Sequence, residues 1–344
     1  MKSVTIIGGG LAGLTLGIGL RQRGIPVTLW EAVRYPHHRV CGEFISGGGL
    51  ESLARLGLRS KLEVAGAVRA TTAAFFSRTN GTVARVLPES ALCLSRFVLD
   101  DLLAKEFRQL GGELREGERS PEKTFSESVV RATGRRAQPQ EAGARWFGLK
   151  IHAHNVALTA DLEMHVAPHG YVGLCRINGG AVNVCGLFRR NGQTTNDSNH
   201  WRELLRGIPG SPLHERLKSA TFDERSFCAI AGLSLRPYRA ADRPECCVGD
   251  SVTMIPPVTG NGMSMAFESA EMALEPLRKW SNGEQSWENA RQTIARNCDT
   301  AFANRLAWAR RLQTLMLSSA LQRPLVFLAE RSGFFWRWWF ARTR

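Results

Sequence analysis

Six glycines stand within the first 20 residues, MKSVTIIGGGLAGLTLGIGL, in a stretch that is otherwise largely apolar. Glycine weakens both helices and strands, so this concentration needs a physical reason. Three structures would account for it: a secretory signal, a buried strand and helix, or a strand–turn–helix that receives a phosphate. Lys2 precedes the apolar segment as in a signal peptide, but no A-x-A-like cleavage site follows it. The sequence therefore argues against a signal peptide.

The phosphate-binding alternative explains the order of residues best. Residues 4–7 are a β-branched run, 14–23 an apolar helix candidate and 27–30 a second strand, which together predict a βαβ unit. Its glycines fit G-x-G-x-x-G. Gly8 permits a tight turn, Gly10 lets the backbone approach a pyrophosphate, and Gly13 lets helix and strand pack closely. Glu31 follows where a carboxylate can accept a ribose hydroxyl. We therefore expect a dinucleotide site, with most of the six glycines making room for the cofactor.

Charge and cysteine usage limit the other classes of function. The formal net charge is +14, from 45 Lys+Arg against 31 Asp+Glu. This excess favours binding of anionic cofactors, substrates or surfaces. Alternatively, it reflects only a general preference of the organism for arginine. No nucleic-acid motif accompanies it, so we expect no nucleic-acid partner. The eight cysteines form no CxxC pair, which predicts reduced thiols and no metal site. No apolar run is long enough to span a bilayer, and we expect a cytoplasmic protein.

Three separated motifs resemble one family. They are GGGLAG with Glu31, SRFVLDDLL at 95–103, and VGDSVTMIPPVTGNGMSMAFESA at 248–270. In this order they resemble the FAD-dependent family of aromatic hydroxylases, geranylgeranyl reductases and flavin-dependent halogenases. RVCGEF at 39–44 is similar to the geranylgeranyl-reductase-like branch. The resemblance implies an FAD-dependent oxidoreductase with NAD(P)H as transient reductant.

The same resemblance assigns cofactor residues. It places Asp250 at the ribityl chain of the flavin and Arg96 toward the cofactor, although Arg96 also fits a first-turn surface residue. Arg39 and Gly42 would pass near the flavin. The loop after Asp250 would approach the flavin ring, through Pro257, Gly260, Asn261 and Gly262. The helix from about Met263 would then aim its positive end at the ring, where it stabilises negative charge.

Two departures from the family pattern limit what is carried over. Hydroxylases of this family usually have an Asp-Gly motif, but residues 132–136 read ATGRR, which leaves open how NAD(P)H is handled. The halogenase signature W-x-W-x-I-P is absent.

The length of 344 residues and the order of the motifs predict an interleaved α/β architecture. A Rossmann-like FAD-binding domain with a parallel sheet would take residues 1–70, 96–140 and 245–280. An antiparallel β-sheet substrate domain would take 71–95 and 141–244. Residues 281–344 would form C-terminal helices that end in an aromatic and basic tail.

The strand-like segment WFGLKIHAH at 146–154 carries the catalytic candidates. Lys150, His152 and His154 alternate along it and therefore face the same side. If that face looks onto the flavin, they would serve as general acids or orient a substrate. Otherwise they form the polar outer face of an antiparallel strand.

The tail ERSGFFWRWWFARTR combines aromatic and basic residues, which suits a membrane interface or the mouth of a channel for a lipid-like substrate. Its aromatics would otherwise dock on the protein itself. The sequence leaves the oligomeric state open.

The function expected is an FAD-dependent oxidoreductase in which NAD(P)H-reduced flavin acts on an apolar or lipid-like organic substrate. Two outcomes stay open, reduction of a carbon–carbon double bond and monooxygenation. The alternative is a non-catalytic flavin-binding redox sensor, which would keep the cofactor motifs but oxidise no NAD(P)H.

Overall fold

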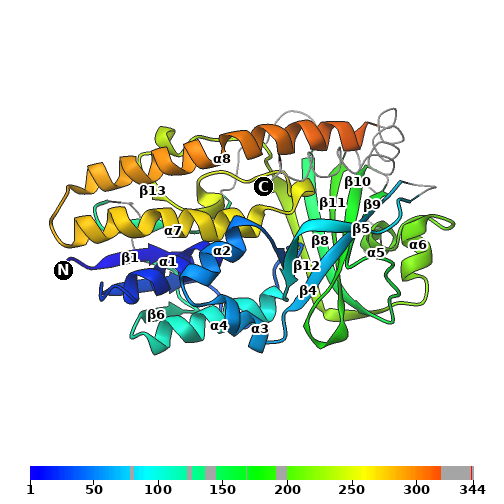
Figure 1. Ribbon diagram of the computed structural model, residues 1–344, viewed down its shortest axis with the longest axis horizontal. Helices are drawn as coiled ribbons and strands as arrows, with labels where there is room; N and C mark the ends of the chain where they lie inside the picture. Colours follow the sequence, from blue (N-terminus) through cyan, green and yellow to red (C-terminus); the bar gives the residue numbers. More distant parts are fainter. Residues whose placement is uncertain are drawn as a thin grey trace.

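The computed structural model describes residues 1–77, 81–121, 126–135, 145–167, 169–190, 200–318 and 342. Two β-sheets lie side by side along the long axis of the molecule, and helices cover both (Figure 1). The first sheet, sheet A, lies near the N-terminus. The second, sheet B, fills the opposite half.

Sheet A is fully parallel and has the strand order β13-β7-β1-β2-β6. Its strands are β1 (Val4–Ile7), β2 (Val27–Glu31), β6 (Glu113–Glu116), β7 (Val129–Arg131) and β13 (Cys246–Cys247). The βαβ unit predicted from the glycine-rich opening is thus present, with α1 (Leu11–Arg21) connecting β1 to β2. The return of residues 245–247 to this sheet brings a segment from far along the chain beside the first strand of the βαβ unit.

Helix α1 is crossed closely by two other helices, α4 (Arg96–Gln109) and α7 (Gly262–Ser281). A Cβ atom at Gly17 would lie 2.8 Å from the ring of Phe107 in α4, and one at Gly19 would lie 2.6 Å from Leu274 in α7. Two of the six opening glycines therefore exist to let helices approach, because any side chain there would collide with a neighbouring helix.

Sheet B has the strand order β12-β8-β11-β10-β9-β4-β5-β3. Its pairings are antiparallel except that of β4 with β9, so the antiparallel sheet expected of the second lobe carries one parallel pair. Its strands are β3 (Phe44–Ile45), β4 (Val68–Phe76), β5 (Arg85–Cys93), β8 (Arg145–His154), β9 (Leu162–Ala167), β10 (Gly170–Arg176), β11 (Val182–Arg190) and β12 (Thr221–Leu233). Strand β3 and the start of β4 fall within residues 1–70, the range predicted for the FAD-binding domain.

Alternating side chains of sheet B divide between two clusters. Ile151 and Val184 pack with residues of α5 (His200–Arg206) and α6 (Pro212–Leu217) on one face. Tyr171 and Leu187, on the other face, share a cluster with residues of the long helix α8. This alternation is typical of a sheet that is covered on both sides.

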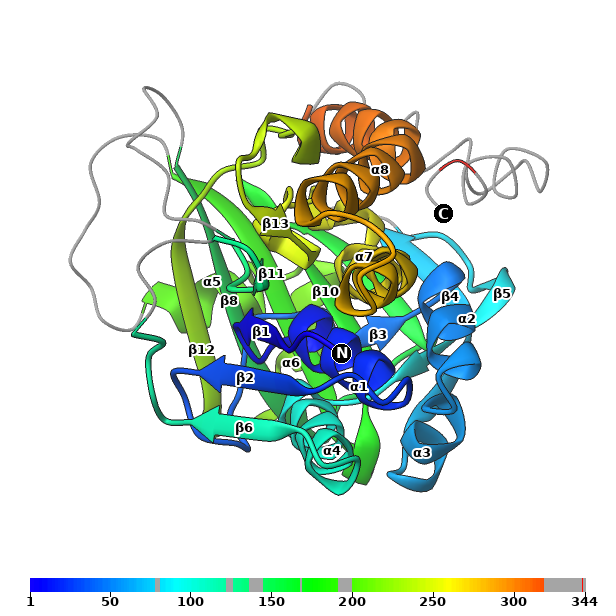
Figure 2. The ribbon, with the colours of Figure 1, turned by 90° about the vertical axis from the view of Figure 1, so that its left-hand side faces the viewer.

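Three further helices complete the described fold. Helix α2 (Gly48–Arg55) packs against α7 and against α3 (Arg59–Val64), and α8 (Trp287–Leu317) runs from one half of the molecule to the other (Figure 1). Figure 2 shows α8 stacked on α7. Arg305 of α8 joins the two helices through an ion pair of 2.7 Å with Glu268.

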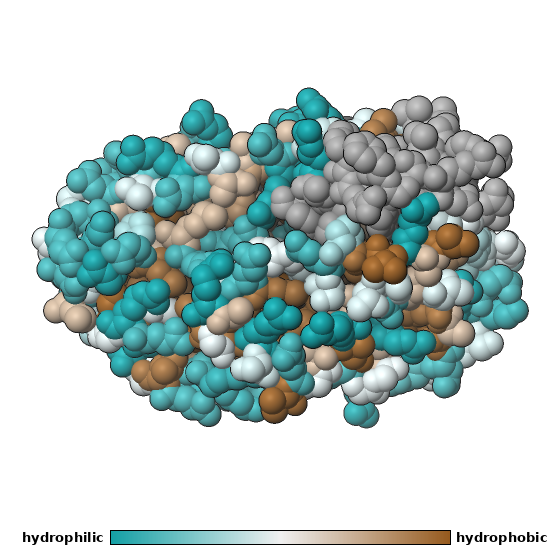
Figure 3. Space-filling model, in the orientation of Figure 1, coloured by the Kyte–Doolittle hydropathy of each residue, from teal (hydrophilic) through white to brown (hydrophobic). Residues whose placement is uncertain are grey.

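The face seen in Figure 3 is mostly hydrophilic, and its apolar residues form only small groups. Within the described ranges, none of the helices has the length and apolarity to cross a membrane. The aromatic residues of the tail lie outside the described residues, so its membrane or docking role stays a prediction.

Candidate active site

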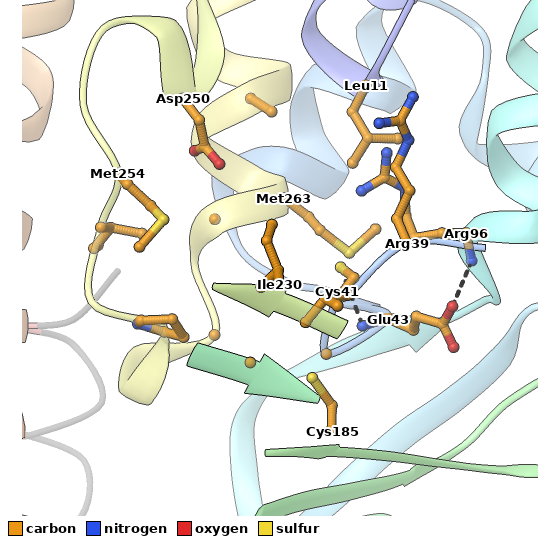
Figure 4. Close-up of a pocket in the computed structure, with 18 of the residues that line it drawn as sticks. Leu11, Arg39, Cys41, Glu43, Arg96, Cys185, Ile230, Asp250, Met254 and Met263 are labelled. Carbon is orange, nitrogen blue, oxygen red and sulfur yellow. Dashed lines mark hydrogen bonds between the residues drawn. The ribbon is translucent and has the colours of Figure 1, made fainter. Parts of the chain in front are cut away.

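One cavity of about 1310 Å³ lies where sheet A meets sheet B. Its walls come from distant parts of the sequence, including Gly10 from the opening turn. Figure 4 shows Leu11 of α1, Glu43 from the segment before β3, and Asp250 around this space. Pockets for a single small ligand are typically 300–1,000 Å³, so this cavity has room for a large cofactor together with a substrate.

Most of the predicted cofactor residues line this cavity, whereas Gly13 and Asn261 do not. Those that line it are Gly8, Gly10, Glu31, Arg39, Gly42, Arg96, Asp250, Pro257, Gly260 and Gly262. Residues separated by more than 200 positions therefore face the same space.

The opening turn leaves space at one glycine only. A Cβ atom at Gly10 would meet nothing within 4 Å, whereas one at Gly13 would lie 1.9 Å from the carbonyl oxygen of Gly8. A Cβ at Gly9 would lie 2.0 Å from the hydroxyl of Tyr35. The expectation that most of the six glycines make room for a cofactor is therefore wrong, because a Cβ atom at each of the other five would collide with neighbouring parts of the protein.

The start of α1 has the properties of an anion site. Gly10 is the N-cap residue, no side chain caps the helix, and no acidic residue stands in its first turn. Helix-terminal N–H groups without partners carry partial positive charge and bind phosphate groups well. This uncapped terminus at the wall of a large cavity fits the pyrophosphate of FAD.

Glu31 ends β2 beside this turn. One carboxylate oxygen accepts the N–H of Gly9 at 2.7 Å, and the other accepts the N–H of Val33 at 3.1 Å. Both bonds hold the carboxylate at the cavity wall, where it remains able to accept a ribose hydroxyl.

A buried ion-pair network holds the two cavity arginines. Arg96 binds Asp100 through two hydrogen bonds of 2.6 and 2.7 Å, and Arg39 donates to the same carboxylate at 3.2 Å. Arg39 also reaches Glu31 at 3.4 Å. Sequence reasoning did not single out Asp100, although its i,i+4 spacing from Arg96 on a helix was a usable signal.

Asp250 lies in the short helical turn η3 (Gly249–Ser251), close to α1. Its carboxylate accepts no hydrogen bond from the described residues. Burial raises the pKa of this carboxyl to about 6, although the positive charges of Arg96 and Arg135 lower it in part. A carboxylate without donors beside a cofactor-sized space fits a partner with hydroxyl groups, such as a ribityl chain.

The loop from η4 (Pro257–Thr259) into α7 forms the cavity wall beyond Asp250. Gly260 has φ +66°, and a Cβ there would lie 2.0 Å from the ring of Phe44, so only glycine fits. Gly262 begins α7 with open space around it, since a Cβ would meet only Ile255 at 4.0 Å. The first turn of α7 has no acidic residue, which leaves its positive end directed at this wall.

None of the three catalytic candidates lines the cavity. His154 is exposed, whereas Lys150 and His152 are buried against Glu43, a residue that sequence reasoning did not single out. The carboxylate of Glu43 lies 3.3 Å from the Lys150 amine and 2.7 Å from Nε2 of His152. The segment carrying Glu43 thus separates Lys150 and His152 from the cavity.

Glu43 joins the two sheets. It is fully buried with a left-handed backbone (φ +58°), and it also accepts the N–H of Arg96 at 2.8 Å. Burial alone would raise its pKa, but the hydrogen bond from His152 and the charge of Lys150 lower it. Burial and Lys150 lower the pKa of the neighbouring His38 to about 4, so this histidine is neutral near pH 7.

Four cysteines line the cavity, namely Cys41, Cys175, Cys185 and Cys228. All eight cysteines are free thiols, and across the described ranges no group of three or more His, Cys, Asp or Glu is placed to hold a metal ion.

Comparison with known proteins supports the cofactor assignment. Residues 1–146 match the family described as FAD binding domain. A stretch of 60 residues is 42% identical to squalene epoxidase erg1 of Aspergillus fumigatus. That match covers 17% of this chain and 12% of the relative, so the chain spans only a small part of the protein it resembles there.

Solved structures share the fold over nearly the whole chain. A flavoprotein/dehydrogenase from Cytophaga hutchinsonii has a TM-score of 0.77 at 15% identity and covers 99% of this chain and 92% of its own. PqsL of P. aeruginosa with 2-aminobenzoylacetate has 0.72 at 16%, covering 94% and 99%. Halogenase PltM with phloroglucinol and FAD has 0.71 at 17%, covering 98% and 85%. At these identities the likeness concerns the fold.

Proposed function

We propose that the chain is an FAD-dependent oxidoreductase similar to the aromatic hydroxylases and flavin-dependent halogenases. Within that class it would be a monooxygenase for an apolar organic substrate, with NAD(P)H as reductant. One observation carries the proposal. The dinucleotide turn and the Asp250 loop face a single cavity, and the rest of that cavity is lined largely by apolar side chains.

The residues present fit FAD along its length. The start of α1 at Gly10 would hold the pyrophosphate, Glu31 the ribose, and Asp250 the ribityl chain. The start of α7 at Gly262 would face the ring. Bound FAD supplies the redox chemistry, taking up reducing equivalents and passing them on to dioxygen or substrate.

The protein contributes binding, orientation and exclusion of water. Apolar side chains from sheet B and α8 keep the substrate region dry, which strengthens every electrostatic interaction within it. The excess of positive charge, +14 in total, favours approach of an anionic dinucleotide reductant. Oxygen chemistry is favoured over double-bond reduction because a curated relative is named as an epoxidase. The geranylgeranyl-reductase-like branch stays a prediction.

Product analysis with and without dioxygen tests the proposal. The purified protein, loaded with FAD, is supplied with NAD(P)H and an extract of apolar metabolites, under dioxygen labelled with oxygen-18. We expect flavin absorbance near 450 nm, oxygen-dependent oxidation of NAD(P)H, and one labelled oxygen atom in the product.

Other outcomes discriminate among the alternatives. Turnover without dioxygen that adds two hydrogen atoms to the substrate would identify a double-bond reductase and refute monooxygenation. Bound flavin without any NAD(P)H oxidation would favour the redox sensor. A folded protein that refuses FAD would contradict all three functions.

A further inference from the structure

The buried ion pair of Lys150 and Glu43 has a third partner at the cavity wall. Lys150 is fully buried on β8, and its amine lies 3.3 Å from the carboxylate of Glu43. The same amine lies 3.2 Å from Nδ1 of His38, a half-buried residue that lines the cavity. A buried ion pair is often no more stable than an apolar replacement, so stability alone does not account for this lysine.

The contact with Lys150 fixes the position of the proton on His38. The ammonium group of lysine has three donors and no acceptor. Nδ1 of His38 must therefore accept this hydrogen bond, which leaves the proton of the neutral ring on Nε2. The ring stacks on Phe97 with 4.6 Å between centroids and meets the edge of His152 at 5.2 Å. These contacts hold the plane of the imidazole as well as its tautomer.

The Nε2–H group of His38 is available to a ligand. Nε2 makes no hydrogen bond with a described residue, and it is not among the buried polar atoms that lack a partner. It points away from Lys150, because the two nitrogens lie on opposite edges of the ring. Arg39 and Cys41, which follow His38 in the chain, also line the cavity (Figure 4). A hydrogen-bond donor with an accessible edge therefore lies in this wall.

The charges around His38 keep its ring neutral. Lys150 and His152 face it from β8, Glu43 from the segment before β3, and Asp223 from β12. Burial is the largest influence and the positive charge of Lys150 the next, and together they lower the pKa of His38 to about 4 despite the two carboxylates. A neutral donor suits an uncharged acceptor, because no counter-ion has to accompany it.

We propose that His38 is a substrate-binding residue that donates its Nε2–H to a carbonyl or hydroxyl oxygen of the substrate, and that Lys150 is the positioning residue that holds this tautomer. The substrate class is then an uncharged, largely apolar molecule with an oxygen acceptor at this wall of the cavity. The inference rests on the proposed function, whose substrate it specifies. Lys150 acts through His38 and needs no contact with the cavity.

Nitrogen NMR of the histidine rings tests the tautomer without any turnover. The FAD-loaded protein is labelled with nitrogen-15 in histidine, and the signal that is lost in His38→Gln identifies His38. We expect a neutral ring protonated at Nε2 from pH 8 down to about pH 5. In Lys150→Met the same ring should sample both tautomers, and its pKa should rise by at least about one pH unit.

A second variant removes the risk that Lys150→Met does not fold. Lys150→Met alone leaves the carboxylate of Glu43 buried without its cation, which is strongly destabilising. The double variant Lys150→Met/Glu43→Gln removes both charges of the pair together. The ring of His38 should sample both tautomers there too, because the donor to Nδ1 is gone.

A matched pair of probes tests the donor itself. 2-Acetylnaphthalene and 2-isopropylnaphthalene have nearly the same shape, but only the ketone accepts a hydrogen bond. Equilibrium dialysis measures their binding to the FAD-loaded wild type and variants. We expect His38→Leu to lower the preference for the ketone about fivefold, as loss of one hydrogen bond allows. His38→Gln keeps an N–H donor of similar reach and should retain the preference within about twofold.

His154→Leu provides the matched control. His154 is exposed on the same strand as Lys150 and does not line the cavity, so its replacement should leave the preference for the ketone unchanged.

Each contrary result overturns a defined part of the proposal. A wild-type ring that is protonated at Nδ1, or charged at pH 7, would refute the tautomer set by Lys150. A ketone preference that survives in His38→Leu, or that falls equally in His38→Gln, would refute the donor role of His38. Failure of both probes to bind would refute an apolar substrate at this wall. Absence of FAD binding, with the tautomer and the probe preference intact, would refute the proposed function and leave the role of His38 standing.

Discussion

Asp250 lines the cavity with a carboxylate that has no hydrogen-bond donor among the described residues of the FAD-free protein. Its pKa is raised to about 6 by loss of solvent. The folded protein therefore binds a proton at Asp250 more tightly than the unfolded chain does. Linkage requires stability to fall as the pH rises from about 4 to 6, and to stay lower above that range.

Replacing Asp250 with Asn should separate folding from cofactor binding. Asn cannot ionise, so Asp250→Asn should stabilise the FAD-free protein above pH 7 by up to about 3 kcal/mol, with no gain below pH 4. The same change should weaken FAD binding about tenfold, because a charged acceptor is lost. Urea unfolding across this pH range and FAD titration measure the two effects. Equal stability of both proteins at pH 8 would contradict the raised pKa.

Gly10 and Gly13 stand three positions apart but differ in what surrounds them. Gly10→Ala should leave the melting temperature of the FAD-free protein nearly unchanged, because a Cβ there meets nothing within 4 Å. It should nevertheless weaken FAD binding by at least about tenfold, since the backbone can no longer approach the pyrophosphate. Gly13→Ala should instead destabilise the fold by several kcal/mol. Thermal unfolding with FAD titration distinguishes them, and equal effects would refute this division of roles.

Helix α4 carries charge on both its buried and its exposed sides. Asp100 faces inward, is fully buried, and holds Arg96 and Arg39 at the cavity wall. The adjacent Asp101 faces outward and pairs with Lys105 at 2.6 Å. The two ion pairs therefore differ in how much stability is lost when the carboxylate is removed. The loss is large for the buried pair, which leaves an unpaired buried charge, and small for the exposed pair.

Adjacent substitutions on α4 test that difference. Asp100→Asn should destabilise the protein by about 3–5 kcal/mol, since Arg96 would keep a buried charge without its counter-ion. It should also weaken FAD binding by releasing both arginines. Asp101→Asn should change stability by less than about 1 kcal/mol. Chemical denaturation of the two variants provides the measurement, and similar losses would indicate that Asp100 is not effectively buried.

The cavity belongs to the whole molecule, because neither sheet encloses it alone. Gly10 and Asp250 line it from the side of sheet A, while Tyr171 and Gly173 line it from sheet B. Glu43 binds both sides, contacting Arg96 of α4 and His152 of β8. A ligand in this cavity therefore contacts residues of both sheets at once.

FAD should accordingly stabilise both halves together. We expect one thermal unfolding transition that moves upward as a unit, by about 2.7 kcal/mol of stability at an FAD concentration of 100 times the Kd. Calorimetry with and without FAD measures this. The observation of two transitions, of which only one responds to FAD, would show that the two sheets unfold independently.

Much of the cofactor site was accessible from local patterns. The βαβ unit and its parallel sheet were predicted from the glycine turn, and the use of FAD from the resemblance of three motifs to a family of flavoproteins; these predictions are confirmed. These features depend on short stretches in which spacing alone carries the signal, since a turn, a helix start and a following strand are neighbours in the chain. The assignment of individual cofactor residues stays a prediction.

The roles of most glycines and of Lys150 required three-dimensional packing. The pattern G-x-G-x-x-G does not reveal that Gly17 meets Phe107 or that Gly19 meets Leu274, because those partners come from distant helices. Strand alternation placed Lys150 and His152 on one face correctly, but it could not show that Glu43 covers them. Backbone pattern is a local property of the chain, whereas burial and partners depend on long-range contacts, and only those contacts decided which side chains reach the cavity.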